Sequence, residues 1–167
     1  EGGEMSEALS GRFDGWLSFQ DRLAAGMAMA AADPADLYFC DLDFAHWPLG
    51  SASVVEAFHQ WVMASSATQC LLLALHFDAM PRQHSRWIKW RQPWGHRVQC
   101  RVVPEYAAAG LLPTFVLKDR LAIRIMDVKT GAGIWSTDPA TIRDWLSEID
   151  VISQRSHEAL PVTTLGL

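Results

Sequence analysis

The sequence is poor in cysteine and has no long apolar run. Its three cysteines, Cys40, Cys70 and Cys100, are an odd number and each lies inside an apolar segment, which favours reduced core thiols over a disulfide framework. No apolar run approaches the roughly 20 residues that a membrane span needs. The N-terminal residues lack the basic and apolar regions of a signal peptide. We therefore expect a cytoplasmic protein with no membrane span.

The chain also lacks an excess of positive charge. Its 167 residues carry a formal net charge of −5 and half of them are hydrophobic. A chain of this length hides roughly 68–70% of its unfolded surface, enough for a core without disulfides or metals. Any affinity for nucleic acid or lipid must come from a local patch. We expect residues 1–9 to be an expression remnant or a disordered segment, and residues 10–167 to form one domain.

Apolar spacing predicts both helices and strands in the chain. The predicted helices cover a segment from about Ser10 to Ala32, 51–67, 81–92, a short turn over 104–110, and a last helix from Pro139 through Ile152. The predicted strands are 37–40, 70–75, 98–102, 115–117, 121–125 and 132–135, with a tight turn at Lys118-Asp119. The strand, helix, strand unit over 37–75 predicts two parallel strands joined by a right-handed crossover. The order predicts an α/β fold, a three-layer α/β/α sandwich with a mixed sheet.

Polar side chains follow the first two central strands. Asp41, Asp43 and His46 follow one strand, and His76 and Asp78 follow the next. Ligands of α/β sheets gather beyond the carboxyl ends of strands, and these side chains could together hold a divalent cation. The spacing is not a strong metal signature, so we predict that the aspartates cap loop amides and that no metal or cofactor is bound. A metal-dependent phosphohydrolase at this strand end is the alternative.

The segment Phe39 to Asp43 also resembles the first motif of haloacid-dehalogenase-type phosphatases, an apolar strand running into Asp-x-Asp. In that family the first carboxylate attacks phosphorus and the second handles leaving-group protons. The family continues with a glycine and a hydroxyl residue, whereas this chain has the bulky residues 44–46. Its late paired acidic motif, which holds magnesium, has no counterpart. The resemblance therefore remains only an alternative.

No acidic residue lies between Asp78 and Glu105, and this gap is basic. It contains Arg82, Arg86, Lys89, Arg91, Arg97 and Arg101. A helix over 81–92 places three of these cations on one face and Trp87, Trp90 and Trp94 on another. The segment 82–101 could bind nucleic acid by phosphate contacts and stacking. Tryptophans at helical spacing more often dock a helix on a sheet, so nucleic acid is not the expected partner.

The chain as a whole resembles a small bacterial family of uncharacterised domains that have the phospholipase D-like fold without its catalytic motif. The resemblance covers about residues 10–167. It is carried by Leu37–Asp43 with Trp47, the basic helix, Arg97–Arg101, Phe115–Arg120, Ser136–Pro139, Trp145–Ile149 and Thr163–Leu167. It implies a phospholipase D-like fold for this chain.

Active phospholipase D enzymes carry His-x-Lys-x-x-x-x-Asp across the hairpin that here contains Asp119. If Asp119 is the motif's aspartate, Leu112 stands at the histidine position and Thr114 at the lysine position. The Gly-Ser-x-Asn feature downstream is replaced by residues 136–139. Leu112 cannot attack phosphorus and Thr114 cannot hold the phosphoryl oxygens as a lysine does. The resemblance therefore implies a chain that is not a working phosphodiesterase, with no catalytic residues.

What the resemblance then implies is a binding or regulatory module. Its partner would be a protein, a second copy of the chain or a phosphorylated small molecule. Arginines bind phosphate without catalysing anything. The candidate anion-binding residues are Arg97, Arg101, Arg120 and Arg124.

Overall fold

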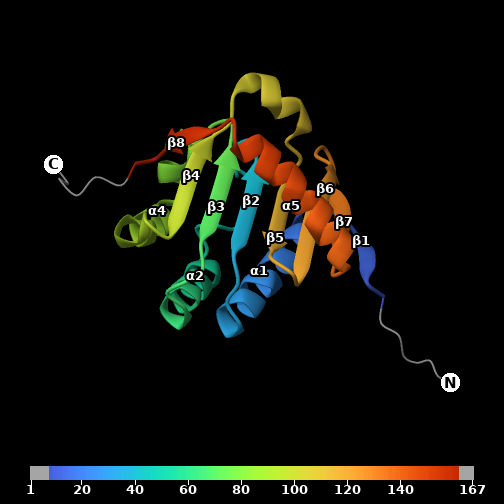
Figure 1. The fold of residues 1–167 in the computed structure, drawn as a ribbon, viewed down its shortest axis with the longest axis horizontal. Coiled ribbons are helices and arrows are strands. Elements are labelled where there is room, and N and C mark those ends of the chain that lie inside the picture. Colours follow the sequence, from blue (N-terminus) through green and yellow to red (C-terminus); the bar gives the residue numbers. More distant parts are fainter. Residues whose placement is uncertain (1–7, 162–167) are drawn as a thin grey trace.

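The computed structural model describes residues 8–161, and a single eight-stranded sheet forms its centre (Figure 1). The strands are β1 (Ser10–Asp14), β2 (Leu37–Asp41), β3 (Cys70–Ala74), β4 (Val98–Val102), β5 (Thr114–Leu117), β6 (Leu121–Asp127), β7 (Ala132–Ser136) and β8 (His157–Ala159). Their order in the sheet is β1-β7-β6-β5-β2-β3-β4-β8. The predicted central strands are all present, and β1 and β8 extend the sheet at its two edges.

Helices cover both faces of this sheet. The helices are α1 (Trp16–Ala32), α2 (Ala52–Ala64), α3 (Met80–Gln83), α4 (Ser85–Arg91) and α5 (Pro139–Ser153), with short 3-10 turns η1 (Gln92–Trp94) and η2 (Glu105–Gly110). The larger core cluster joins α1, α2 and α4 to one face, and the smaller one joins α5 to the other. Figure 1 shows α5 alone crossing its face. This arrangement confirms the predicted α/β/α sandwich.

The sheet is mixed, as predicted. β2, β3 and β4 are parallel, because helices cross over between them. β5 and β6 form an antiparallel hairpin, and β5 pairs antiparallel with β2. In the turn between β5 and β6, Asp119 adopts a positive φ of 68° and the Arg120 N–H donates to the Leu117 carbonyl at 3.0 Å. The tight turn at Lys118-Asp119 is therefore confirmed.

The prediction of a helix from Ser10 was wrong, because Ser10–Asp14 forms strand β1 and α1 starts only at Trp16. β1 pairs along β7, with Gly11 opposite Trp135. Among its five residues only Phe13 is buried, so the apolar spacing in this stretch is too sparse to separate a strand from a helix. Pairing with β7 decides the conformation, since tertiary context overrides a weak local preference.

The predicted helix over 81–92 is also broken, at His84. This residue has φ −128° and ψ 48° and separates α3 from α4. Its buried ring is hydrogen-bonded at both nitrogens, with the Gly50 N–H donating to Nδ1 at 3.2 Å and the Phe44 carbonyl 2.9 Å from Nε2. Because Nδ1 accepts, Nε2 must carry the proton that it donates to Phe44. The ring thus ties this segment to the loop after β2.

Two expectations concern residues outside the described range. Most of the expected remnant or disordered segment, residues 1–9, lies outside it, and so does Thr163–Leu167 of the family resemblance. Within the described part, no helix combines the length and apolar character that crossing a bilayer requires.

Candidate functional site

Asp41 ends β2 and holds the loop that follows it. Its side chain is 6% exposed, and Oδ2 accepts from the Phe44 N–H at 2.7 Å and from the Asp43 N–H at 3.2 Å. Phe44 needs this support because it has a positive φ of 60°. Burial raises the pKa of the Asp41 carboxyl above its ordinary value of 3.8, although the two N–H bonds act in the opposite direction. Asp41 therefore caps loop amides, as the sequence predicts.

The other strand-end residues do not join Asp41 in a metal site. Asp43 Oδ1 accepts from the Ala45 N–H at 3.0 Å, which is a second local cap. His46 is exposed and stacks on Trp16, with ring centroids 4.5 Å apart. His76 and Asp78 are exposed beyond β3. Between residues 8 and 161 no three such side chains are placed to hold a metal ion.

The hairpin of β5 and β6 contains the positions that the resemblance aligns with the phospholipase D motif. Thr114, at the lysine position, is 1% exposed, and its hydroxyl donates to the Leu112 carbonyl at 2.9 Å. Asp119 is exposed at the turn, at the opposite end of β5 from Thr114. Ser136, in the segment that replaces the Gly-Ser-x-Asn feature, is also used by the fold. It is buried, and its hydroxyl accepts from the Asp138 N–H at 3.0 Å. None of these groups is arranged as a nucleophile.

Arg124 fills the space beside Thr114. The two residues lie opposite each other on β6 and β5, and Arg124 Nε donates to the Thr114 hydroxyl at 2.8 Å. Arg124 Nη1 lies 3.0 Å from Glu148 Oε1, and the guanidinium carbon lies 4.4 Å from the centroid of the Trp145 ring. Glu148 and Trp145 both belong to α5. The helix therefore supplies Arg124 with an acid and an aromatic cover, and the sequence analysis missed both partners.

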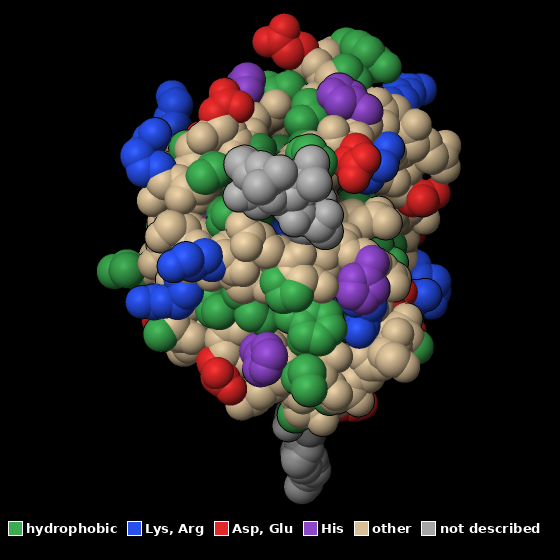
Figure 2. Space-filling view, turned by 90° about the vertical axis from the view of Figure 1, so that its left-hand side faces the viewer, with side chains coloured by type: hydrophobic (Ala, Val, Ile, Leu, Met, Phe, Trp, Pro, Cys, Tyr) green, Lys and Arg blue, Asp and Glu red, His purple; other side chains and the backbone are tan. Residues whose placement is uncertain are grey.

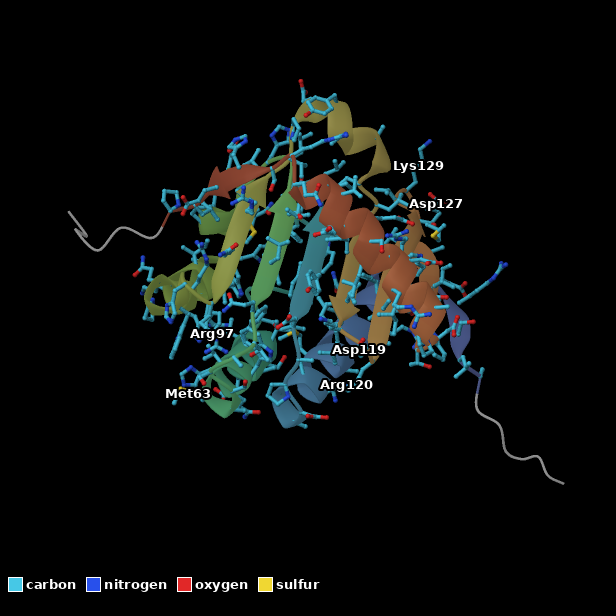
Figure 3. The ribbon with its side chains drawn as sticks, in the orientation of Figure 1. Met63, Arg97, Asp119, Arg120, Asp127 and Lys129 are labelled. Atoms are coloured by element: carbon cyan, nitrogen blue, oxygen red, sulfur yellow. The ribbon has the colours of Figure 1, made fainter. Side chains whose placement is uncertain are left out.

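The four predicted anion-binding arginines do not meet. Arg97 Nε and Nη2 donate to the Thr68 and Ser65 carbonyls, both at 2.6 Å, near the loop before β3. Arg120 pairs with Asp33 at 3.1 Å, at the turn between β5 and β6. Figure 3 shows Arg97 beside α2 and Arg120 at that turn. Arg124 is occupied by Glu148, so these three arginines hold separate parts of the chain together.

Arg101 is the fourth arginine, and it lines a cavity. Its Nε donates to the Ser156 hydroxyl at 2.7 Å, and its Nη2 donates to the Ser156 carbonyl at 2.8 Å. The cavity measures about 360 Å³ and is also lined by Arg91, Gly95, His96, Gln99, Cys100 and Glu158. The sequence signal for it was the acid-free gap between Asp78 and Glu105, because Arg91 through Arg101 all lie there.

The tryptophans of the basic segment pack against the protein. Trp87 is completely buried and lies edge-on to Phe58, with ring centroids 6.0 Å apart. Trp90 donates its indole N–H to His59 Nδ1 at 3.2 Å. The break at His84 also interrupts the predicted face of Arg82, Arg86 and Lys89. The interpretation of the tryptophans as a docking stripe is thus confirmed, and no continuous helix presents cations and aromatic rings together.

Comparison with known proteins gives a likeness of fold. No protein-family model and no curated protein sequence matches the chain. The solved structure of Nuc, a phospholipase D family member from Salmonella typhimurium, is similar with a TM-score of 0.57 at 7% identity, over 90% of this chain and 98% of that one. NucT from Helicobacter pylori is similar with a TM-score of 0.57 at 9% identity, over the same shares.

A third similar structure is that of TrmBL2, an archaeal chromatin protein whose structure shows a novel mode of DNA binding. Its TM-score is 0.66 at 10% identity, over 91% of this chain and 54% of that one, so this chain spans about half the length of TrmBL2. At such identities the likeness concerns the fold alone. The chain has a phospholipase D-like α/β fold.

Proposed function

We propose that this chain is a non-catalytic phospholipase D-like domain that binds a partner or a phosphate-bearing ligand. The observation that carries the proposal is the closed cluster of Thr114, Arg124 and Glu148. It occupies the part of the hairpin where the resemblance places the reactive histidine and lysine. The similarity to Nuc and NucT supports the fold on which this comparison rests.

The chemistry of the cluster explains why it would not cleave a phosphodiester. A nucleophile must be accessible and activated by a neighbouring base. The Thr114 hydroxyl is buried, donates to a carbonyl and accepts from a guanidinium, which is a cation and cannot serve as a base. The Glu148 carboxylate already lies against Arg124. A phosphate group would have to displace that carboxylate before it reached the arginine.

We do not favour DNA binding as the function of this chain, although TrmBL2, which has a similar fold, is a chromatin protein that binds DNA. Base stacking needs exposed aromatic rings, and Trp87 is buried while Trp90 is bonded to His59. The cations of the broken helix also serve the fold in part, since Arg86 Nη1 donates to the Gly50 carbonyl at 2.9 Å. A small phosphate-bearing ligand or a protein partner would not require exposed aromatic rings for base stacking.

The test is a phosphodiesterase assay on the purified chain with bis-p-nitrophenyl phosphate and with a labelled DNA oligonucleotide. We expect no turnover above the buffer rate, with or without magnesium. The control is Thr114→Val, which removes the hydroxyl at nearly constant volume. Turnover in the original chain that disappears in this variant would overturn the proposal.

A further inference from the structure

Strand β1 is an edge strand whose outer side has no neighbouring strand in the described part of the chain. The sheet order ends at β1, and Figure 1 shows it at the edge, next to β7. Its pairing with β7 runs without a bulge from Ser10 to Asp14. Exposed edges are templates for pairing with another chain, and proteins shield them with very short strands, prolines, bulges or charges. β1 has no proline and no bulge, and its two charges, Arg12 and Asp14, are of opposite sign.

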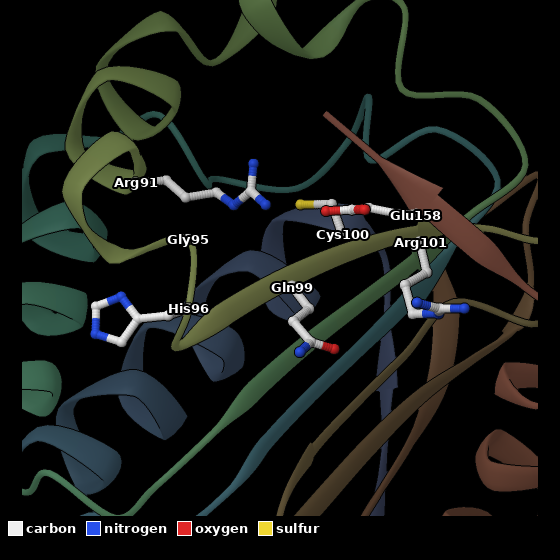
Figure 4. Close-up of a pocket in the computed structure, with 7 residues that line it drawn as sticks. All are labelled: Arg91, Gly95, His96, Gln99, Cys100, Arg101 and Glu158. Atoms are coloured by element: carbon white, nitrogen blue, oxygen red, sulfur yellow. The ribbon is translucent and has the colours of Figure 1, made fainter. Parts of the chain in front are cut away.

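The other edge of the sheet is better shielded. β8 has only three residues, and it is followed by Leu160, with a positive φ of 48°, and by Pro161. Proline cannot donate to a further ladder. Figure 4 shows β8, which carries Glu158, beside the later part of β4, and Figure 2, which views the molecule from this side, shows basic, acidic and hydrophobic side chains interspersed there. Pairing with a further strand is therefore favoured at β1.

The hydrogen bonds to β7 decide which backbone groups of β1 point outward. The Thr137 N–H donates to the Leu9 carbonyl at 2.7 Å, so these two residues form a hydrogen-bonded pair. Such pairs alternate with non-bonded pairs along an antiparallel ladder. Gly11 and Phe13 therefore also bond to β7. The N–H and C=O groups of the residues between them point outward, and these exposed residues are Ser10, Arg12 and Asp14.

Few antiparallel registers can join this edge to the same edge of a second copy, because outward-pointing residues must lie opposite one another. A two-fold axis at Arg12 would place the two Arg12 side chains opposite each other, and like charges there are destabilising. An axis at Gly11 would pair Arg12 only with the partner's Ser10. An axis at Phe13 places each Arg12 opposite the partner's Asp14, and neither side chain has an ion pair among residues 8–161. Charge therefore favours the register centred on Phe13.

Two exposed leucines support the same register. Leu9, just before β1, is 57% exposed, and Leu17, in the first turn of α1, is 78% exposed. Leu9 and Phe13 share one face of the strand because side chains alternate, and α1 packs with Phe13 on that face. Gly15 continues the extended backbone, with φ −175° and ψ 174°. Leu9 and Leu17 are equally far from Phe13 in the sequence, so an axis at Phe13 brings the partner's Leu9 toward Leu17.

We propose that two copies of this chain pair through the outer edge of β1, as antiparallel strands related by a two-fold axis at Phe13. Each Arg12 and the partner's Asp14 exchange both of their backbone N–H···O=C bonds, and their side chains form an ion pair on the face of the sheet. The eight-stranded sheets of the two copies join into one continuous sheet. The proposal goes beyond the proposed function, since it does not depend on the chemistry of the hairpin of β5 and β6.

The experiment is sedimentation velocity of the full chain over a range of concentration. The paired edge is short and the interface small, so we expect a dissociation constant on the order of 10–100 μM. The sedimentation coefficient should therefore rise toward that of a dimer between about 5 and about 500 μM chain. A chain that stayed monomeric throughout this range would overturn the proposal.

Charge reversal at two exposed positions tests the register. Arg12→Asp places acids opposite acids and Asp14→Arg places bases opposite bases, so each variant alone should dimerise at least about tenfold more weakly. An equimolar mixture of the two variants restores both opposite-charge pairs, and we expect a heterodimer with the affinity of the original chain. Glu56→Arg is the control, because Glu56 is exposed on α2, away from β1.

Two results with these variants would overturn the register. One is dimerisation of each single variant as strong as that of the original chain and of Glu56→Arg. The other is a mixture of Arg12→Asp and Asp14→Arg that associates no better than either variant alone.

The dimer and the non-catalytic function fail in different ways. Phosphodiester turnover would overturn the proposed function and leave the pairing of β1 as it is. A monomeric chain would overturn the pairing and leave the closed cluster of the hairpin as it is.

Discussion

Arg124 and Arg91 are both buried, but their surroundings differ. Arg124 lies under α5 and meets Glu148, Thr114 and the face of Trp145. Among residues 8–161, the hydrogen bonds of Arg91 go to the carbonyls of Val98 and Leu160. Arg124 is thus paired with a carboxylate of α5, whereas Arg91 ties the end of α4 to β4 and to the residue after β8 through carbonyl oxygens. The Arg124 cluster is therefore an ionic contact between the sheet and α5, and the Arg91 contacts are hydrogen bonds of a buried cation to the backbone.

Gly133→Ala should disturb the packing around Arg124 on β6 and should have the largest effect on stability. An added Cβ would lie 2.1 Å from the Arg124 carbonyl oxygen and 2.9 Å from the Ile125 Cα, both of them backbone atoms of β6. We expect a loss of about 3 kcal/mol or more in the free energy of unfolding. Urea unfolding measures it, with Gly110→Ala as the control because nothing lies within 4 Å of that position. Equal stabilities of the two variants would contradict the packing.

Arg124→Met should have the next largest effect. It keeps much of the packing against Trp145 but removes the hydrogen bond to the Thr114 hydroxyl and the pairing with Glu148. We expect a loss of about 2 kcal/mol. Glu148→Gln should cost about 1 kcal/mol or less, because the Glu148 side chain is 55% exposed and solvent screens the ion pair. If urea unfolding reversed this order, the cluster would not depend on the arginine.

Asp41 offers a smaller, pH-dependent comparison. Burial raises the pKa of its carboxyl on folding above 3.8, so the folded chain binds this proton more tightly than the unfolded chain. The resulting stabilisation is complete below pH 3.8 and is lost as the pH rises through the raised pKa. At pH 7 we expect Asp41→Asn to be more stable than the original chain by on the order of 1 kcal/mol.

Denaturant unfolding of both proteins between pH 4 and pH 8 measures this difference, which should shrink toward the acid end. An advantage of Asp41→Asn that did not change with pH would show that burial of the charge is not its cause.

The cysteines provide a test without any change in stability. Cys40 is buried near Arg124 and Cys100 near Arg91, and burial raises the pKa of both thiols to about 12. Burial also raises the pKa of Cys70. Because the thiolate is the reactive form, we expect labelling of the native chain at pH 8 at least about 1,000-fold slower than in denaturant. Mass spectrometry of the labelled peptides would identify any thiol that reacts faster.

The centre of the fold could be predicted because its signals are local. The apolar runs before Asp41 and His76 predicted β2 and β3, and the alternation at 98–102 predicted β4. The edges could not, because β1 and β8 are short and depend on their neighbours β7 and β4. The break at His84 likewise depends on hydrogen bonds to Gly50 and Phe44, far away in the sequence.

The sequence predicted which types of residue stand at the candidate site better than it predicted which residues lie together there. The replaced motif at Leu112 and Thr114 was visible in the sequence, but the pairing of Arg124 with Glu148 depends on where α5 lies on the sheet. Arg101 was among the predicted anion-binding residues, whereas Arg91 was noticed only as one cation of the basic segment. Burial distinguishes Arg91 from the solvated cations, and no sequence pattern reports it.

The segment from α5 to β8 connects the helix that covers one face of the sheet to the strand at one of its edges. α5 is the helix that packs on the smaller core cluster, and Ser156, just before β8, is held by Arg101 of β4. Detaching this segment would uncover apolar residues on one side and free β4 on the other. Partial opening of the last 20 or so described residues is therefore unfavourable at either end, and we expect hydrogen exchange in α5 and β8 to proceed as one cooperative unit.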